Sequence, residues 1–366
     1  MNKRNPGGYK KSADGIFMLL LALLFSFIVC SLLLLLYNAD LGTAYAAMFR
    51  GAWGSKYTLG ETLSKAAPLL LVALGFYVGS QSGMFNIGGE GQMYAGALGA
   101  ALVALYMPAG TPRVIAILLI MVTGAVFGML WALPVAYFKT KFGVSEIVMT
   151  VMLNEVAAGI ISYLVSVPMR DPLTPVHHSA MFPTNFQLPV LLKGTKIHFG
   201  VLVAFLCIFL VWFFMKKTTF GYRISAVGLS QKAACYAGMP VASVMIVSMM
   251  ISGGFGGLAG AFEATGIHSR LIESVTGGFG YTAIVMVHLG KKNPVYIALA
   301  AFAFASLTVG ADAMQRAVGT PSMLSSLMQG TVVFFFIISE YIVKRIRKAL
   351  RNRAYAREAA AAPAKA

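Results

Sequence analysis

Long apolar runs are the feature that most constrains the fold of this chain. About ten segments are strongly apolar, and most of them approach the ~20 residues that an α-helix needs to cross a bilayer. Apolar residues make up 58% of the chain and charged residues only 11%. The sequence therefore predicts an all-α, polytopic membrane protein with about ten transmembrane helices. The segments are residues 16–37, 66–79, 92–107, 114–138, 146–167, 199–215, 241–262, 280–289, 294–310 and 324–343.

The distribution of basic residues predicts the orientation of the chain. If all segments cross and the N-terminus is inside, 20 of the 29 Lys and Arg residues lie on the cytoplasmic side. Such a bias is typical of cytoplasmic loops, so both termini are expected inside, and the net charge of +17 indicates contact with membrane lipid and not with nucleic acid. The expected parts are a cytoplasmic tail at 1–15, a transmembrane domain at 16–343 and a basic cytoplasmic tail at 344–366.

A glycine-rich polar stretch, SQSGMFNIGGEGQ at residues 80–92, interrupts the apolar pattern. Irregular backbone at membrane depth is tolerated only inside protein or along a water-filled path, so this stretch indicates a polar pathway; a short cytoplasmic turn is the alternative. The segments at 66–79 and 280–289 are too short for straight spans and predict interrupted helices. Interruptions recur in both halves, which is the pattern of an inverted-topology repeat.

Ionisable residues in apolar segments are candidates for a polar pathway, because a charge in the bilayer usually faces a cavity or a partner. Glu90 and Glu155 are the strongest candidates. Glu146 starts its segment and is expected at a cytoplasmic helix end, and His288 is expected near the inner interface.

No pattern in the sequence predicts an enzyme. The GxxxxGK[ST] motif of P-loop ATPases is absent, and GFGGLA at residues 254–259 lacks the preceding strand of a dinucleotide site. The spacings Gly253/Gly257 and Gly256/Gly260 instead favour close helix packing. Histidines 177, 178 and 198 are expected in a solvated outer loop, and no metal site is expected.

A second informative stretch is the loop at 216–240, KKTTFGYRISAVGLSQKAACYAGMP. It is too polar to span a membrane and too long for a turn. Residues 226–238 are expected to form a helix that docks in a groove of another protein; a surface helix without a partner is the alternative.

Four motifs resemble one transporter group. GMFNIGGEGQMYAGAL, SEIVMTVMLNEVA, FGYRISAVGLSQKAACYAGMPV and GGFGYTAIVMVHLGKKNP occur in the order found in membrane subunits of ABC importers of the ribose, nucleoside and branched-chain amino acid permease group. The second motif is most similar to nucleoside-type members. Ser225 stands where this group usually has arginine, which is consistent with one member of a heteromeric permease pair.

The resemblance implies a permease that imports nucleosides by alternating access in a bacterial plasma membrane. ATP and magnesium would be bound by a separate ATPase subunit, with no cofactor in this chain. The implied partners are that ATPase, a second permease chain and an extracytoplasmic substrate-binding lipoprotein. The alternatives are a simple-sugar permease and a proton-coupled secondary transporter.

The resemblance also implies two sets of site residues. A nucleoside pathway is expected to combine aromatic, amide and carboxylate groups. The expected pathway residues are Phe85, Asn86, Glu90, Gln92, Asn154, Glu155, Phe279 and Tyr281. The residues expected to couple the permease to its ATPase are Gly221, Arg223, Gly228, Ala233 and Gly238.

Overall fold

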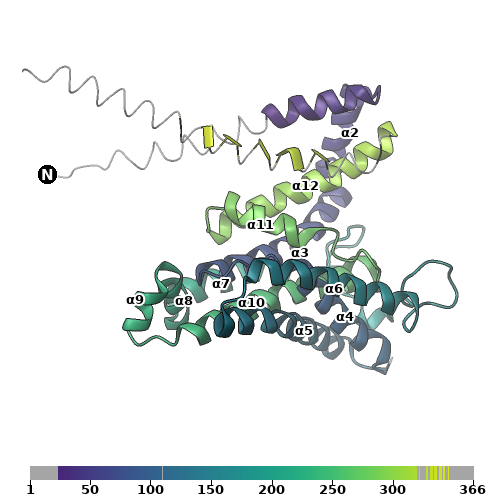
Figure 1. Ribbon diagram of the computed structural model, residues 1–366. Helices are drawn as coiled ribbons and strands as arrows, with labels where there is room; N and C mark the ends of the chain where they lie inside the picture. The colour runs from purple at the N-terminus through teal and green to yellow at the C-terminus, as the bar shows by residue number, and fades with distance from the viewer. Residues whose placement is uncertain are drawn as a thin grey trace, which may run out of the picture. The chain divides into compact units, whose positions relative to one another are not determined.

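The computed structural model is helical, and within the residues that it describes no β-strand is formed beyond isolated bridges (Figure 1). The chain divides into two compact units, Trp53–Ser306 and a smaller unit from Met1–Ala52 and Leu307–Ala366. The predicted all-α class is confirmed. The described residues are 24–108, 110–319, 321, 327–328, 330–332, 334–335, 338–339, 341–342 and 345.

Six of the described helices are long and apolar enough to cross a membrane. The count of about ten spans is therefore not confirmed. Apolar helices at Leu24–Leu36 and Phe279–Leu289 are shorter. The predicted tail at 1–15, the tail at 344–366 apart from residue 345, and much of segment 324–343 lie outside the described residues. The six are α3 (Lys56–Gln81), α5 (Arg113–Phe142), α6 (Glu146–Ser166), α7 (Phe199–Lys217), α10 (Val241–Phe262) continued by the π-helical turn η2 (Glu263–His268), and α12 (Pro294–Val318).

The prediction of a short second segment is wrong, because α3 runs unbroken from Lys56. Ser55 caps its N-terminus by accepting a hydrogen bond from the Thr58 amide. The first turns contain polar residues that the apolar pattern excludes, but Thr62 and Ser64 are buried within the protein. The interruption itself is real and follows Gln81, at the end of this helix.

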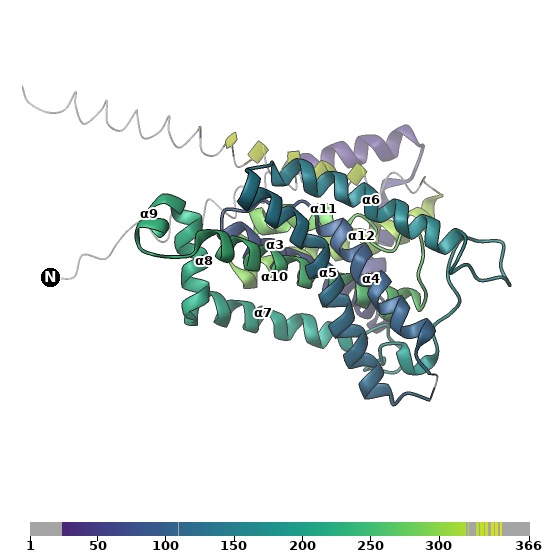
Figure 2. The ribbon, with the colours of Figure 1, turned by 60° about the horizontal axis from the view of Figure 1, so that its bottom comes forward.

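Helix α10 packs against α3, α5 and α4 (Gly89–Tyr106) in the larger unit (Figures 1 and 2). Glycines make these contacts close: a Cβ atom on Gly96 would collide with the Gly257 backbone, and one on Gly260 would collide with the Met93 carbonyl. The close helix packing predicted from the glycine spacings in α10 is confirmed. It brings the first turns of α4, where the polar residues lie, against α10.

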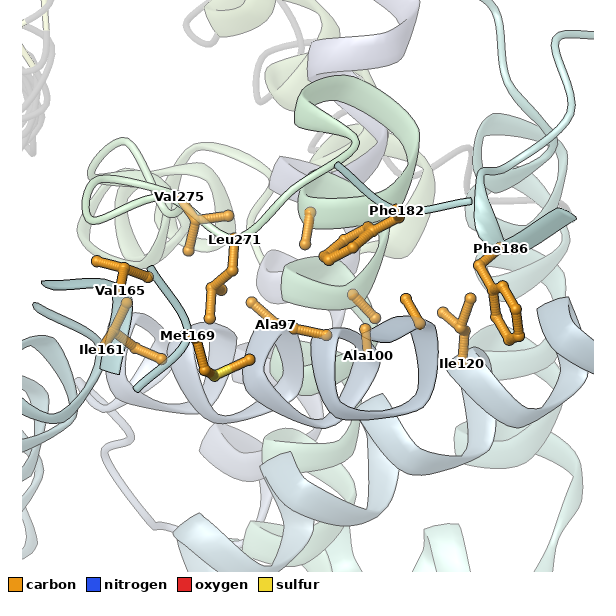
Figure 3. Close-up of a cluster of buried hydrophobic side chains, with 14 of the residues drawn as sticks. Ala97, Ala100, Ile120, Ile161, Val165, Met169, Phe182, Phe186, Leu271 and Val275 are labelled. Atoms are coloured by element: carbon orange, nitrogen blue, oxygen red, sulfur yellow. The ribbon is translucent and has the colours of Figure 1, made fainter. Parts of the chain in front are cut away.

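An apolar cluster packs the far end of α4 against neighbouring elements (Figure 3). Ala97 and Ala100 of α4 and Ile120 of α5 contribute from helices, whereas Phe182 and Phe186 come from the long loop between α6 and α7. The loop is thus a folded cover over this end of α4 and not a solvated connection.

The smaller unit contains α2 (Leu41–Trp53) and the last turns of α12. Gly310 approaches the Met48 backbone and Gly51 approaches Ala313, so this helix pair also relies on small residues. Cys30, Leu34 and Met314 belong to its apolar core.

Candidate functional site

The polar break joins α3 to α4 through residues 82–88. Its first residue is hydrogen-bonded to α10. Ser82 ends α3, and the Ser248 hydroxyl of α10 donates a hydrogen bond of 2.6 Å to the Ser82 hydroxyl. Gly83 then has φ +82°, a left-handed conformation that glycine adopts without strain. The break is therefore held inside protein, as irregular backbone in a membrane must be.

Asn86 and Gln92 form a reciprocal amide pair at the centre of the break. Each side-chain nitrogen donates to the other's oxygen at 3.0 Å. Asn86 also donates to the Ser252 hydroxyl at 2.7 Å and accepts from the Gly88 amide at 2.9 Å. Both amides are buried, so this geometry gives them a role in holding the turn and leaves no free group of Asn86 for a substrate.

Asn154 of α6 closes the N-terminus of α4. Its oxygen accepts from the Gly91 amide at 2.9 Å, and its nitrogen donates to the Ile87 carbonyl at 3.0 Å. A second donor contact, at 3.2 Å, reaches the Tyr281 hydroxyl of α11 (Phe279–Leu289). The first amides of a helix have no partner within the helix, so Asn154 acts as a cap supplied by another helix.

Glu90 is a buried carboxylate in the first turn of α4, directly after the break. Its side chain is 4% exposed. The Thr276 side chain and the Gly280 backbone, at the start of α11, lie within hydrogen-bonding reach of it. A helix N-terminus favours negative charge nearby, which explains how a carboxylate is tolerated at this position.

Phe85 belongs to the break, and its ring lies near His288 of α11. Its ring packs edge-to-face against Phe76 at 5.3 Å between centroids, and at 6.4 Å from the ring of His288. The side chain of His288 is exposed. Glu146 begins α6 as predicted and forms a 2.7 Å ion pair with Lys139.

Of the three remaining pathway candidates on α6 and α11, two are exposed. Glu155 follows the buried Asn154 and lies on the outward face near the middle of α6. Tyr281 is 43% exposed, whereas Phe279 is buried. The structure thus separates the predicted pathway residues: Asn86, Glu90, Gln92, Asn154 and Phe279 are interior, and Glu155 and Tyr281 face outward.

The predicted docking helix is two helices, α8 (Thr219–Leu229) and α9 (Gln231–Tyr236). Ser230 breaks the predicted helix at 226–238 because its side chain caps α9, accepting from the Ala233 amide at 3.3 Å. Both helices lie at the end of α7 (Figure 2). The side chain of Tyr236 is 94% exposed.

The predicted coupling residues lie in different environments. Gly221 packs against the end of α7, and a Cβ on Gly228 would collide with the Gln81 carbonyl at the end of α3. Arg223 and Ala233 are exposed, and Gly238 ends the region with φ +75°. Of these five, only Arg223 and Ala233 present free side chains to a partner.

Two hollows between helices of the larger unit are apolar. One of about 400 Å³ lies between α3, α7 and α12, and one of about 280 Å³ lies between α4, α5 and α6. Almost all of their lining is carbon, so they suit lipid chains or apolar side chains better than a polar solute.

The prediction of solvated outer histidines is correct only for His177. His178 and His198 are buried, and burial lowers the pKa of His198 to about 4, so its ring is neutral at ordinary pH. No group of three His, Cys, Asp or Glu side chains that could hold a metal ion occurs in the described part of the chain.

Sequence reasoning missed the polar residues between η2 and α11. Glu273 and Thr276 lie in the irregular segment 269–278, beside α4 and α6. The sequence could have indicated these residues, because SRLIESVTGG is a polar stretch between two apolar segments. Glu273 and Thr276 precede the fourth motif, which starts at Gly277, and so were not considered with it.

Comparison with known proteins shows the family to which the chain belongs. Residues 58–337 match the family described as branched-chain amino acid transport system, permease component. The guanosine ABC transporter permease protein NupP of Bacillus subtilis is 30% identical over 91% of this chain and 96% of its own length. The glucose ABC transporter permease protein TsgB13 of Haloferax volcanii is 34% identical (85% and 83%), and the nucleoside ABC transporter permease protein NupB of Lactococcus lactis is 28% identical (90% and 93%). No solved structure matches. The resemblance seen in the four motifs is confirmed, and the chain belongs to this permease family, as a multi-pass membrane transport component and not an enzyme.

Proposed function

We propose that this chain is a permease subunit of an ABC importer that takes up nucleosides. The supporting observation is the similarity, over about nine tenths of each chain, to permeases named for guanosine and for nucleosides. ATP and magnesium are bound by a separate ATPase subunit. A substrate-binding lipoprotein delivers the nucleoside to the outer face, and both termini lie in the bacterial cytoplasm.

The second permease subunit covers the outward face of α6. A carboxylate near the middle of an apolar helix, such as Glu155, is costly in lipid and usually faces a cavity or partner. A partner chain on this face, with a water-filled path between the two, removes that cost. NupP and NupQ, both named guanosine permeases and both from Bacillus subtilis, support a heteromeric pair.

The substrate moves along this path past Glu155 and Tyr281, with Phe85 at its inner end. A second layer of residues lies behind this path and holds the break in shape; it consists of Asn86, Gln92, Asn154 and Phe279. On the cytoplasmic side, α9 inserts into the ATPase, since Tyr236 of α9 and the nearby Leu229, which ends α8, leave their apolar side chains 94% and 89% exposed.

A simple-sugar permease is the second candidate, supported by the glucose permease TsgB13. Nucleosides and simple sugars share a ring with adjacent hydroxyl groups. Both candidates therefore place a hydroxylated ring in the path, and they differ in whether a base is also required.

Reconstitution tests the function directly. The complete complex is placed in liposomes with ATP inside, and uptake of radiolabelled guanosine, uridine and ribose is measured. We expect ATP-dependent nucleoside uptake that survives an uncoupler and stops in a Walker-lysine variant of the ATPase. Uptake of ribose alone contradicts the nucleoside assignment, and uptake that an uncoupler abolishes supports a proton-coupled transporter instead.

A further inference from the structure

The short helix α11 exposes one tyrosine and one histidine along a single face. Of its 11 residues, Tyr281 and His288 are the two that are exposed, and the others are buried or half-buried. Seven residues span close to two helical turns, so both side chains lie on the same face of α11. Polar side chains in a bilayer usually face a cavity or a partner. This face of α11 therefore suits the polar path proposed above better than it suits lipid.

His288 belongs to a cluster of three rings, with Phe85 of the break and Phe76 of α3. The centroid of the His288 ring lies 6.4 Å from that of Phe85 and 6.4 Å from that of Phe76. Phe76 is buried and packs edge-to-face against Phe85, so it forms the inner side of the cluster. Phe85 is half-buried and His288 is exposed. The cluster therefore offers aromatic surface to a solute where the break meets α11.

One hydrogen bond fixes the orientation of the imidazole. The Nδ1 atom of His288 lies 2.8 Å from the Ile284 carbonyl oxygen. Because a carbonyl oxygen can only accept, Nδ1 carries the proton, and Nε2 of the neutral ring is a hydrogen-bond acceptor. Nε2 forms no hydrogen bond with any residue that the structure describes. His288 thus presents one unused acceptor beside the Phe85 ring.

The backbone holds the end of α11 in a defined turn. Lys291 and Lys292 have φ of +46° and +59°, a conformation that is uncommon for residues other than glycine. Their amides donate to the carbonyls of His288 and Val287, at 3.1 and 3.3 Å, so the turn closes directly on the last turn of the helix. Backbone strain of this kind persists where the surrounding structure requires it, and it is frequent at functional sites. The turn fixes the position from which His288 reaches the cluster.

We propose that His288 and Phe85 bind the nucleobase of the substrate at the inner end of the path. A base is a flat ring with hydrogen-bonding groups on its edge, so it can stack on the Phe85 ring while an edge N–H donates to Nε2 of His288. A simple sugar offers no such ring. This pair is therefore where the permease distinguishes a nucleoside from a sugar. The proposal rests on the function proposed above.

Blocking the edge of the base tests the proposal. In the reconstituted complex, ATP-dependent uptake of uridine is compared with that of 3-methyluridine, in which a methyl group replaces the edge N–H. Both are measured at saturating loaded binding protein, so the remaining discrimination reports on the permease. The variant is His288→Phe, which keeps a ring and removes the acceptor. The matched control is His177→Phe, because His177 is an exposed histidine of the loop between α6 and α7.

We expect wild type and His177→Phe to import uridine about fivefold faster than 3-methyluridine, which is the effect of one neutral hydrogen bond. His288→Phe should lower uridine uptake to the rate of 3-methyluridine and leave the analogue nearly unchanged. Phe85→Leu should lower uptake of both nucleosides to a similar extent, because it removes the stacking surface and not the acceptor. Thermal unfolding midpoints of the complexes confirm that the variants fold.

Two results overturn the proposal: equal uptake of uridine and 3-methyluridine by wild type, or an unchanged ratio in folded His288→Phe. If His288→Phe does not assemble, the wild-type comparison decides. If the wild-type complex imports ribose but no nucleoside, the proposed function fails, and the base site fails with it. If it imports nucleosides and the ratio does not change, only the base site is wrong.

Discussion

The amide pair of Asn86 and Gln92 shows how a polar break is stabilised where water is scarce. Each donor of the pair meets an acceptor, and Ser252 and Gly88 use the remaining groups of Asn86. In a low-dielectric interior such a network is favourable only when every member is satisfied. The same residue types that suggested a substrate pathway are thus also those required to fold the break.

We expect Asn86→Ala to lower the thermal stability of the complex, and to lower transport only as a consequence of that loss. It removes four hydrogen bonds, and at the roughly 0.6 kcal/mol typical of polar contacts in membranes the loss is about 2 kcal/mol. The thermal unfolding midpoint of the purified complex measures it. Ser252→Ala, which removes one of these bonds, should cause a smaller decrease. Lost uptake with an unchanged midpoint would instead place Asn86 in the pathway.

At the scale of helices, the sequence predicted contacts better than boundaries. The glycine spacings predicted close packing of α10, because small residues are visible directly in the sequence. The start of α3 could not be predicted, because Thr62 and Ser64 are polar residues that the protein buries. Hydropathy measures lipid compatibility and not burial within protein.

The sequence also did not show which residues of α6 are exposed. Asn154 and Glu155 are neighbours, yet one is buried and the other exposed, because adjacent residues point about 100° apart on a helix. Only the packing of α6 on α4 decides which of the two faces inward. The candidate pathway was therefore predicted as a set of residue types, and its division into two layers required the structure.

Gly257→Ala should weaken the contact between α10 and α5. Its Cβ would collide with the Gly124 carbonyl, and overpacking of this kind typically costs about 1–3 kcal/mol. Gly159→Ala in α6 is the matched control, because nothing lies within 4 Å of a Cβ there. We expect a lower unfolding midpoint for Gly257→Ala alone; equal midpoints would show that the α10 contact adapts.

Ala233→Trp should uncouple the permease from its ATPase while leaving the chain folded. Ala233 is exposed on α9, so a large side chain there obstructs a partner without disturbing the permease. The expected result is a normal unfolding midpoint with loss of transport and of substrate-stimulated ATP hydrolysis. Normal transport would exclude α9 as the contact.

Gly228→Trp should behave differently, although both positions belong to the same predicted loop. Its side chain would meet the Gln81 carbonyl within the permease itself, so we expect a lower unfolding midpoint or poor expression. The comparison separates the docking surface, α9, from the support on which it rests, α8.

At the scale of the larger unit, a continuous series of contacts connects the docking surface to the polar break. Helix α8 contacts α9 on one side, and through Gly228 it contacts the end of α3, where the break begins. The break in turn is bonded to α10 through Ser82 and Ser252. A displacement of α9 by the ATPase would therefore reach the break through packed backbone.

The orientation of the whole chain can be tested with a cysteine that it already contains. Cys235 is exposed on α9, whereas Cys30 and Cys207 are buried, so one native thiol reports on the docking side. If α9 is cytoplasmic, an impermeant maleimide should label Cys235 only after the cells are permeabilised, in cells that produce the permease without the ATPase that would cover α9. Ala180→Cys in a Cys235→Ser background should be labelled in intact cells, because position 180 is exposed in the loop expected outside. Labelling of Cys235 but not of position 180 in intact cells would reverse the orientation, and with it the assignment of α9 to an ATPase that lies in the cytoplasm.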